Sequence, residues 1–388
     1  GSPLSYWAGE PGSNPMRVMG GLSGGSWLAH MTADLGDGRM DGAWLAQNFE
    51  NLQPEKAIWE KYTNLLGHVD TEADRFLEFE RWWNGFYTLS RDEILAITQN
   101  LFIGNKLESG ELQICDGCKV DLRQIQNPMI VFASYGDNIT PPAQALGWVP
   151  QVYKDTADLK SAGQRIVYLT NPHVGHLGLF VSASVAKLEH RAILESLDEI
   201  EALEPGLYEM KIDNPTGDPD CHKPDFAVRF EPRDVADIGE RQQNPAALVN
   251  VRRMSELNEA AYSLFVSPWI TAVSNPLTAE ALRRMHPMRV SRMFFSEQFN
   301  PWMRMVHSTA ENIRKDRTPL PSNDPGIVAE RAAFAAVADQ IKAMRLLRDR
   351  ATAAIFETIF GSPDQSQSSA NNNDETDDTS GSGPKEES

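Results

Sequence analysis

The chain has 388 residues, of which 41% are hydrophobic and 23% charged, a globular composition with enough length for two or three domains. Its net charge of −18 argues against nonspecific nucleic-acid binding as its main role. The sequence shows no apolar run of about 18 residues, so we expect no transmembrane segment. We see no signal peptide, and three cysteines are typical of a reducing compartment. We therefore expect a cytoplasmic protein.

The first hundred residues predict a mainly helical segment. Residues 1–40 are Gly-rich and loop-like, with a short helix near residues 26–35. From residue 41 to 105 apolar residues recur three and four apart, which places several aromatic side chains, Trp82 and Trp83 among them, on one helix face. Residues 92–107 predict a further helix.

A short hairpin is expected at residues 111–121, because Asp116-Gly117 is a strong two-residue turn signal. Cys115 and Cys118 flank that turn. A Cys-x-x-Cys pair can serve in redox chemistry or in half of a metal site, but no second pair or nearby histidine supports this. We interpret both as ordinary hairpin residues and predict no metal and no cofactor.

Two apolar, β-branched-rich runs follow, at residues 128–134 and 165–170, with helices expected at 143–153 and 182–197. Strands that alternate with helices predict a parallel sheet and an α/β fold. Two more strands are expected at 206–212 and 226–230. Helices are then expected at 247–266, 277–314 and 327–360, and residues 362–388 read as a disordered acidic tail.

Polar loops follow the two central runs directly. Asp137 comes after the first, and His176, between Gly175 and Leu177-Gly178, comes after the second. Ligands of parallel sheets bind at the carboxyl ends of the strands, and a carboxylate can orient an imidazole there. We therefore predict an Asp137–His176 pair. Asp137 could instead form a turn, and His173 is the alternative histidine.

Ser23 is an alternative nucleophile, because Gly21-Leu-Ser23-Gly-Gly25 matches the G-x-S-x-G pattern of a nucleophile elbow. The order Ser23, Asp137, His176 also suits an α/β-hydrolase. An elbow needs a buried strand before it, however, and residues 14–20 supply few apolar residues. A Gly-rich turn before a helix explains the segment equally well.

A series of motifs resembles the catalytic domain of polyhydroxyalkanoate synthases over about residues 1–190. The matching residues include Phe79-Glu-Arg-Trp82-Trp83-Asn84, Phe132-Ala-Ser, Gly136-Asp137-Asn-Ile139-Thr-Pro141 and Gly175-His176-Leu-Gly178. The chain is also similar to a bacterial family of longer proteins labelled poly(3-hydroxyalkanoate) synthetase-like. Asn138 and Pro142 depart from the synthase pattern, in which His-Ile tends to follow the aspartate and an aromatic residue often follows the nearby proline.

The resemblance implies the C-terminal part of an α/β-hydrolase fold at residues 1–200, with a helical lid at about 8–105. A β-containing connector at 201–245, a helical region at 246–361 and the tail would follow. In the synthases a cysteine in a nucleophile elbow carries the acyl chain. By this resemblance the elbow would lie before residue 1, so Ser23 becomes the weaker candidate. Asp137 and His176 would act as acid and base, with substrate near Asn138, Trp82 and Trp83.

The implied function is acyl transfer from 3-hydroxyacyl thioesters of the acyl-CoA type, and this chain alone is expected to be inactive. An ester hydrolase, such as a depolymerase or esterase, could use the same pair. A non-catalytic protein that binds a granule surface or a partner through residues 277–314 is a third possibility. The sequence leaves room for a homodimer.

Overall fold

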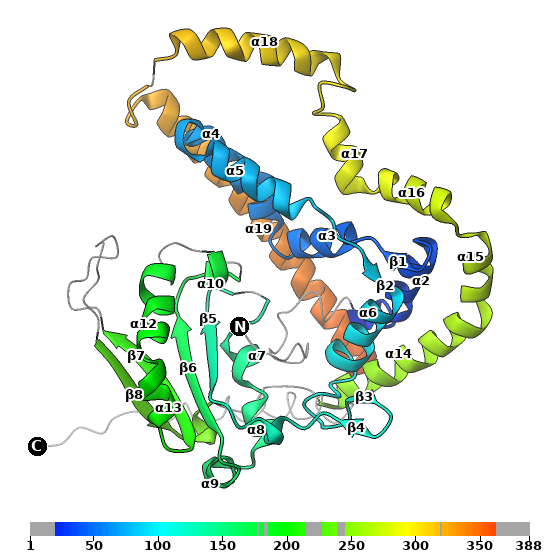
Figure 1. Ribbon diagram of the computed structural model, residues 1–388. Coiled ribbons are helices and arrows are strands. Elements are labelled where there is room, and N and C mark those ends of the chain that lie inside the picture. Colours follow the sequence, from blue (N-terminus) through cyan, green and yellow to red (C-terminus); the bar gives the residue numbers. More distant parts are fainter. Residues whose placement is uncertain are drawn as a thin grey trace, which may run out of the picture.

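The structure, a computed structural model, describes residues 20–137, 139–176, 178–181, 185–213, 227–238, 245–318 and 320–361. It is a mixed α/β protein in which a small, mainly parallel sheet accompanies a larger set of helices (Figure 1). Within these ranges, no helix combines the length and the apolar character needed to cross a bilayer. The expected tail, Asn138 and Cys221 lie outside the described residues.

The main sheet has the strand order β5-β6-β7-β8. It contains β5 (Met129–Ser134), β6 (Arg165–Asn171), β7 (Gly206–Asp213) and β8 (Ala227–Arg233). The first three strands are parallel and β8 is antiparallel to β7. Because Ser134 pairs with Asn171, the chain leaves β5 and β6 at the same edge of the sheet.

Helices cover both faces of the sheet, which explains why β5 and β6 read as continuous apolar runs. Val131 and Ala133 face one core with Trp148, and Phe132 faces the other. The first face is covered by α7 (Pro142–Leu146), α8 (Val149–Val152) and α9 (Thr156–Ser161). The second is covered by α10 (Gly178–Val181), η4 (Ala186–His190), α12 (Arg191–Glu195) and α13 (Leu197–Ala202).

The segment before the sheet is helical, as predicted, apart from short strand pairs. Its elements are α2 (Trp27–Leu35), β1 (Arg39–Met40), α3 (Ala43–Leu52), η1 (Glu55–Glu60), α4 (Lys61–Gly67), α5 (Val69–Trp83), β2 (Leu89–Ser90), α6 (Arg91–Leu95) and η2 (Ala96–Phe102). The helix expected at 92–107 begins at a capping box formed by Ser90 and Glu93 and ends earlier, at Phe102.

The hairpin also forms, from β3 (Gln113–Cys115) and β4 (Cys118–Lys119). Cys115 and Cys118, interpreted from the sequence as ordinary hairpin residues, pair across the turn and are in addition joined by a disulfide, which the sequence analysis did not expect. Two short 3₁₀ turns complete the sheet region, η3 (Leu122–Gln124) and η5 (Val235–Ile238).

In the described part of the chain, six helices follow the sheet. They are α14 (Pro245–Phe265), α15 (Ser267–Val273), α16 (Pro276–Met285), α17 (Pro287–Met293), α18 (Pro301–Asp316) and α19 (Pro325–Phe360). The helix expected at 277–314 is thus divided into three. Pro287 and Pro301 each begin a new helix, because proline cannot continue the hydrogen-bond pattern of the preceding turn but suits the first position of a helix.

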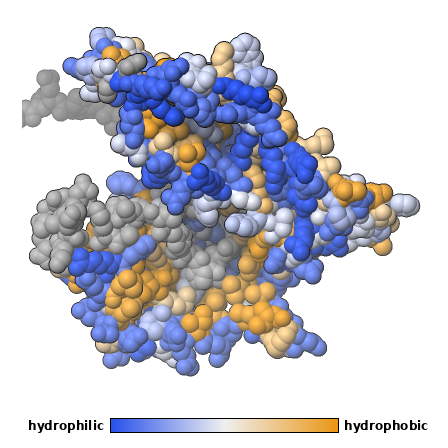
Figure 2. Space-filling view, turned by 45° about the horizontal axis from the view of Figure 1, so that its top comes forward, coloured by the Kyte–Doolittle hydropathy of each residue, from blue (hydrophilic) through white to orange (hydrophobic). Residues whose placement is uncertain are grey.

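The helices at the two ends of the described chain pack together. In Figure 1 the long α19 runs beside the helices of the first hundred residues. It contacts η1 and α14, while α14 and α15 contact α2. Val251, Phe356 and Phe360 form a small core where α14 meets the end of α19. Figure 2 shows a mainly hydrophilic surface over the upper helices, with hydrophobic residues gathered at the right edge and in the lower half.

Candidate functional site

Asp137 and His176 meet at the carboxyl edge of the sheet. Asp137 follows β5, and His176 follows β6. His176 Nδ1 lies 2.8 Å from Asp137 Oδ2. The two residues that the sequence analysis paired are therefore in hydrogen-bond contact, although 39 positions separate them along the chain.

The carboxylate of Asp137 is buried and held by several donors. Its Oδ1 accepts hydrogen bonds from the backbone N–H groups of Ile139, at 2.8 Å, and Thr140, at 2.9 Å. Its Oδ2 accepts one from Thr140 Oγ1, also at 2.8 Å. Burial raises the pKa of Asp137, but the hydrogen bonds from His176, Thr140 and Ile139 outweigh burial and bring this pKa below the ordinary value of 3.8.

This arrangement decides which nitrogen of His176 holds the proton. An ionised carboxylate only accepts hydrogen bonds, so Nδ1 must be the donor toward Asp137. In the neutral ring, Nε2 is then the basic nitrogen. The Asp137 side chain has no exposed surface, whereas 29% of the His176 side chain is exposed. The pair thus has a buried orienting acid and an accessible base.

The loops after β5 and β6 touch closely. Tyr135 N–H and Ser134 Oγ both donate to the carbonyl of Asn171, at 2.9 and 3.0 Å. A Cβ on Gly136 would lie only 2.3 Å from the carbonyl oxygen of His173, so this approach requires glycine. The Asn171 side chain accepts hydrogen bonds from the backbone of His173 and Val174. These contacts shape the loop that presents His176.

Other residues considered from the sequence are located elsewhere. Ser23 lies in the turn before α2, where its carbonyl accepts a hydrogen bond from Trp27 Nε1. Residues 20–22 before it are helical, and its backbone is outside the left-handed region, unlike the strained turn of a nucleophile elbow. His173 is exposed, and its backbone N–H donates a hydrogen bond to the side-chain oxygen of Asn171.

Trp82 and Trp83 lie at the end of α5, with ring centroids 5.9 Å apart. Trp83 stacks on Phe79 and donates a hydrogen bond to Glu50, while 55% of Trp82 is exposed. Among the described residues, no hydrogen bond or ring contact connects either tryptophan with Asp137 or His176. Their expected substrate role stays a prediction, as does that of Asn138.

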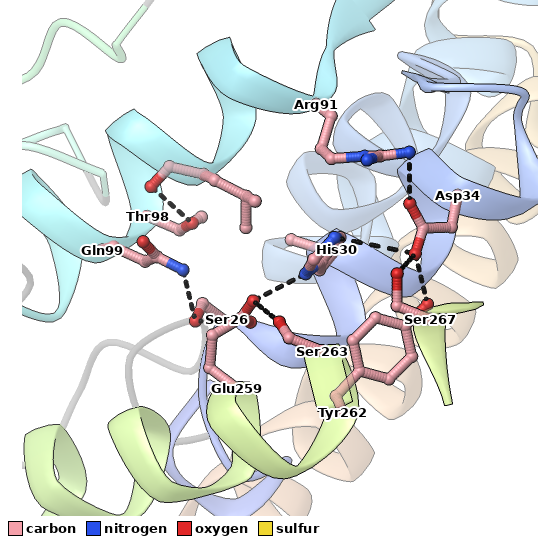
Figure 3. Close-up of polar contacts among 12 residues, drawn as sticks. Ser26, His30, Asp34, Arg91, Thr98, Gln99, Glu259, Tyr262, Ser263 and Ser267 are labelled. Atoms are coloured by element: carbon pink, nitrogen blue, oxygen red, sulfur yellow. Dashed lines mark hydrogen bonds and ion pairs between the residues drawn. The ribbon is translucent and has the colours of Figure 1, made fainter. Parts of the chain in front are cut away.

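A second polar cluster joins α2 to α14 and α15 (Figure 3). Glu259 accepts hydrogen bonds from Ser26 Oγ at 3.2 Å and from His30 Nδ1 at 2.6 Å. Asp34 accepts hydrogen bonds from Tyr262 at 2.8 Å and Ser267 at 2.6 Å. It also forms an ion pair of 2.7 Å with Arg91. Burial and the bond to Asp34 raise the pKa of Tyr262 and keep its phenol protonated.

Burial distinguishes this cluster from the Asp137–His176 pair. Ser26 is 2% exposed and Asp34 is fully buried, so no reactant can approach either side chain. Moreover, Ser26 Oγ bonds to the carboxylate of Glu259 rather than to the ring of His30. The cluster therefore connects helices, and His176 offers the more accessible chemistry. Throughout the described ranges, no group of three or more His, Cys, Asp or Glu is arranged to hold a metal ion.

Sequence reasoning missed two features of these sites. Thr140 was quoted only as part of a motif, yet its hydroxyl contacts both members of the pair, at 2.8 Å from Asp137 Oδ2 and 3.2 Å from His176 Nδ1. The Ser26–His30–Asp34 spacing of four residues was visible as one face of a helix. Its partners on α14 and α15 lie more than 220 residues further along the chain, and no local signal connects them.

Comparisons with known proteins found sequence similarity along most of this chain. An "Uncharacterized protein in ackA 5'region" of Rhizobium meliloti is 42% identical over 371 residues, which cover 94% of this chain and 50% of that protein. The "Poly(3-hydroxyalkanoate) polymerase subunit PhaC" of Haloferax mediterranei is 24% identical over 151 residues, 38% of this chain and 28% of that protein. This chain thus spans half the length of the first relative and less of the second.

No solved structure matches the chain. A family model described as "Protein of unknown function (DUF3141)" matches residues 1–387. Since that match covers nearly every residue, the chain belongs to the DUF3141 family.

Proposed function

We propose that this chain carries the acid–base pair of an α/β-hydrolase-type acyltransferase that acts on 3-hydroxyacyl thioesters. The observation that carries the proposal is the 2.8 Å contact between His176 Nδ1 and Asp137 Oδ2, at the carboxyl ends of two adjacent parallel strands. Local similarity to a poly(3-hydroxyalkanoate) polymerase subunit supports the substrate class. The nucleophile is proposed to come from a part of the full-length protein outside this chain.

In the proposed reaction, His176 Nε2 takes the proton of the nucleophile's thiol or hydroxyl group. The nucleophile then attacks the thioester carbonyl, the carbon–sulfur bond breaks, and coenzyme A leaves as a thiol after it takes up the proton. The acyl group stays on the enzyme until the hydroxyl of a second substrate attacks it. Asp137 keeps Nδ1 protonated and stabilises the imidazolium ion that forms between these steps.

The test uses the full-length protein with 3-hydroxybutyryl-CoA as the probe and measures the release of coenzyme A. We expect His176→Gln to lower turnover by roughly 10³-fold or more, because loss of a triad member removes most covalent catalysis. Substitution of the exposed neighbour, His173→Gln, serves as the matched control and should leave turnover nearly unchanged. Equal turnover in the His176→Gln variant and the unmodified protein would overturn the proposal.

The same assay on this chain alone tests where the nucleophile lies. We expect no burst of coenzyme A. A burst that Ser23→Ala abolishes would identify Ser23 as the nucleophile. It would refute the proposal that the nucleophile lies outside this chain. If the full-length protein instead hydrolyses simple esters through an acyl-serine, and leaves the thioester intact, the same pair serves an ester hydrolase and the transferase proposal fails.

A further inference from the structure

The tip of the β3–β4 hairpin holds a disulfide in an exposed position (Figure 1). Cys115 is the last residue of β3 and Cys118 the first residue of β4, and the two lie opposite each other in the strand register. Their sulfur atoms are joined across the Asp116-Gly117 turn. Every residue of both strands is exposed, Ile114 to 76%. A reagent in solution can therefore approach this bond, in contrast to a disulfide enclosed in a core.

The bond contributes little to the stability of the fold. A disulfide stabilises a protein mainly by shortening loops of the unfolded chain, and this effect grows with the length of the closed loop. Here the two cysteines are only three positions apart. The turn already brings the strands together, because Gly117, at φ 77°, adopts the left-handed conformation that a tight hairpin turn favours. The hairpin can thus form before the two sulfur atoms are joined.

Contacts at the base of the hairpin are independent of the disulfide. The Val120 N–H donates to the Leu112 carbonyl at 2.9 Å, and the Leu112 N–H donates to the Lys106 carbonyl at 2.7 Å. Glu111 forms an ion pair of 3.0 Å with Arg252 on α14. Among the described elements, none packs extensively against β3 or β4 themselves. The base is therefore anchored, while the tip consists of strands too short to be stable alone in water.

We propose that Cys115 and Cys118 form a thiol–disulfide exchange site that accepts two electrons from an external dithiol. An exposed disulfide that adds little stability belongs to the labile kind that takes part in exchange, whereas structural disulfides resist reduction. This role is independent of the acyl transfer proposed for Asp137 and His176, and its test does not rely on that activity.

The exchange takes place in two steps. A thiolate of the external dithiol attacks one cysteine sulfur, the bond between Cys115 and Cys118 breaks, and the other cysteine leaves as a thiolate that takes up a proton. The second thiolate of the donor then attacks the donor sulfur of the mixed disulfide and releases the first cysteine, which also takes up a proton. The donor ends as a cyclic disulfide and the hairpin as a dithiol, so two electrons and two protons have been transferred.

Reduction should open the tip of the hairpin and leave its base in place. Residues 113–119 lose the bond that joins their two strands, and the few backbone contacts that remain between them are marginal in water. The ion pair between Glu111 and Arg252 and the hydrogen bonds of Leu112 are unaffected. Exchange would thus convert a closed tip into an open one with two accessible thiols, without moving α14.

The test measures reduction of the full chain by dithiothreitol. A Cys221→Ser background leaves Cys115 and Cys118 as the two cysteines, and alkylation followed by mass spectrometry counts the free thiols. We expect the folded protein to be reduced at a rate within roughly tenfold of the rate in urea, because the bond is already exposed. A slower rate would mean that the folded protein shields the bond and would overturn the proposal. Two free thiols after treatment with oxidised dithiothreitol would also overturn it.

Cys115→Ser combined with Cys118→Ser separates exchange from a structural role. We expect this variant to unfold at nearly the same urea concentration as the unmodified chain, and a clearly lower midpoint would make the bond a structural cross-link and overturn the proposal. Hydrogen exchange gives a comparison within one molecule. On reduction, exchange in residues 113–119 should accelerate roughly tenfold or more while that of α14 stays the same. Unchanged exchange in residues 113–119 would refute the opening of the tip.

Discussion

At the scale of single residues, Asp137 links the chemistry of the site to stability. Its pKa is depressed in the folded protein, so the ionised carboxylate stabilises the fold. That contribution is fully present above the unfolded-state pKa of about 3.8 and disappears as the pH falls through the lower folded-state pKa. We expect the stability advantage over Asp137→Asn, which cannot titrate, to be largest near neutral pH and to shrink at acidic pH.

Urea unfolding of the two proteins at several pH values measures this difference directly. A difference in unfolding free energy that stays constant from about pH 7 to about pH 3 would show that Asp137 is not held as a stabilised carboxylate.

Thr140 offers a test of how the pair is held in place. Thr140→Val keeps the shape of the side chain and the backbone N–H donor but removes the hydroxyl that donates to Asp137 Oδ2. We expect a loss of about 1–2 kcal/mol in unfolding free energy, because a hydrogen bond to a buried charged group is lost. Thr140→Ser retains the hydroxyl and is the control. Equal losses in both variants would assign the effect to packing.

At the scale of elements, the close approach of the two loops depends on Gly136. An added Cβ would lie 2.3 Å from the His173 carbonyl oxygen, so Gly136→Ala must push the loops apart. We expect a loss of about 1–3 kcal/mol in stability. Gly67→Ala is the matched control, because a Cβ at the end of α4 meets nothing within 4 Å. If Gly136→Ala were as stable as the control, the loops would not be in contact.

The polar cluster between α2 and α14 is the second element-scale contact to test. Asp34→Asn keeps a hydrogen-bond acceptor for Tyr262 and Ser267 but loses the ion pair with Arg91. We expect a stability loss of about 1–3 kcal/mol in urea unfolding. Glu297→Gln removes an exposed pair with His307 and should change stability by less than about 0.5 kcal/mol. A neutral Asp34→Asn variant would contradict the role of the cluster.

At the scale of the whole molecule, helices from the two ends of the described chain form one packed unit. Since α14 and α15 contact α2, and α19 contacts η1, we expect residues 20–102 and 245–361 to unfold together. Native-state hydrogen exchange should therefore give similar opening free energies for the amides of α2 and α14. Much faster exchange in α14 would instead favour a separate helical region at 246–361, the expectation from the sequence.

The sequence could predict those features that are encoded by residues close together in the chain, and it could not predict contacts between distant segments. Apolar runs and the loops after them were sufficient to place β5, β6 and the Asp137–His176 pair, because each of the two residues follows its own strand within a few positions. Proline positions could have divided the segment at 277–314, since Pro287 and Pro301 each start a helix. The contacts of His30 with Glu259 depend on packing between distant helices, and no local pattern encodes them.

Because β5 and β6 pair in register, the contact between Asp137 and His176 depends on how these two strands are aligned. Met129 pairs with Ile166 and Ser134 with Asn171, and three residues later Asp137 reaches His176. A strand advances about 3.3 Å per residue and alternates its faces, so a one-residue deletion in β5 would displace Asp137 and exchange Val131 with Phe132 between the two cores. Insertions or deletions there would cost stability and the acid–base pair together, whereas the exposed β3–β4 hairpin could tolerate them.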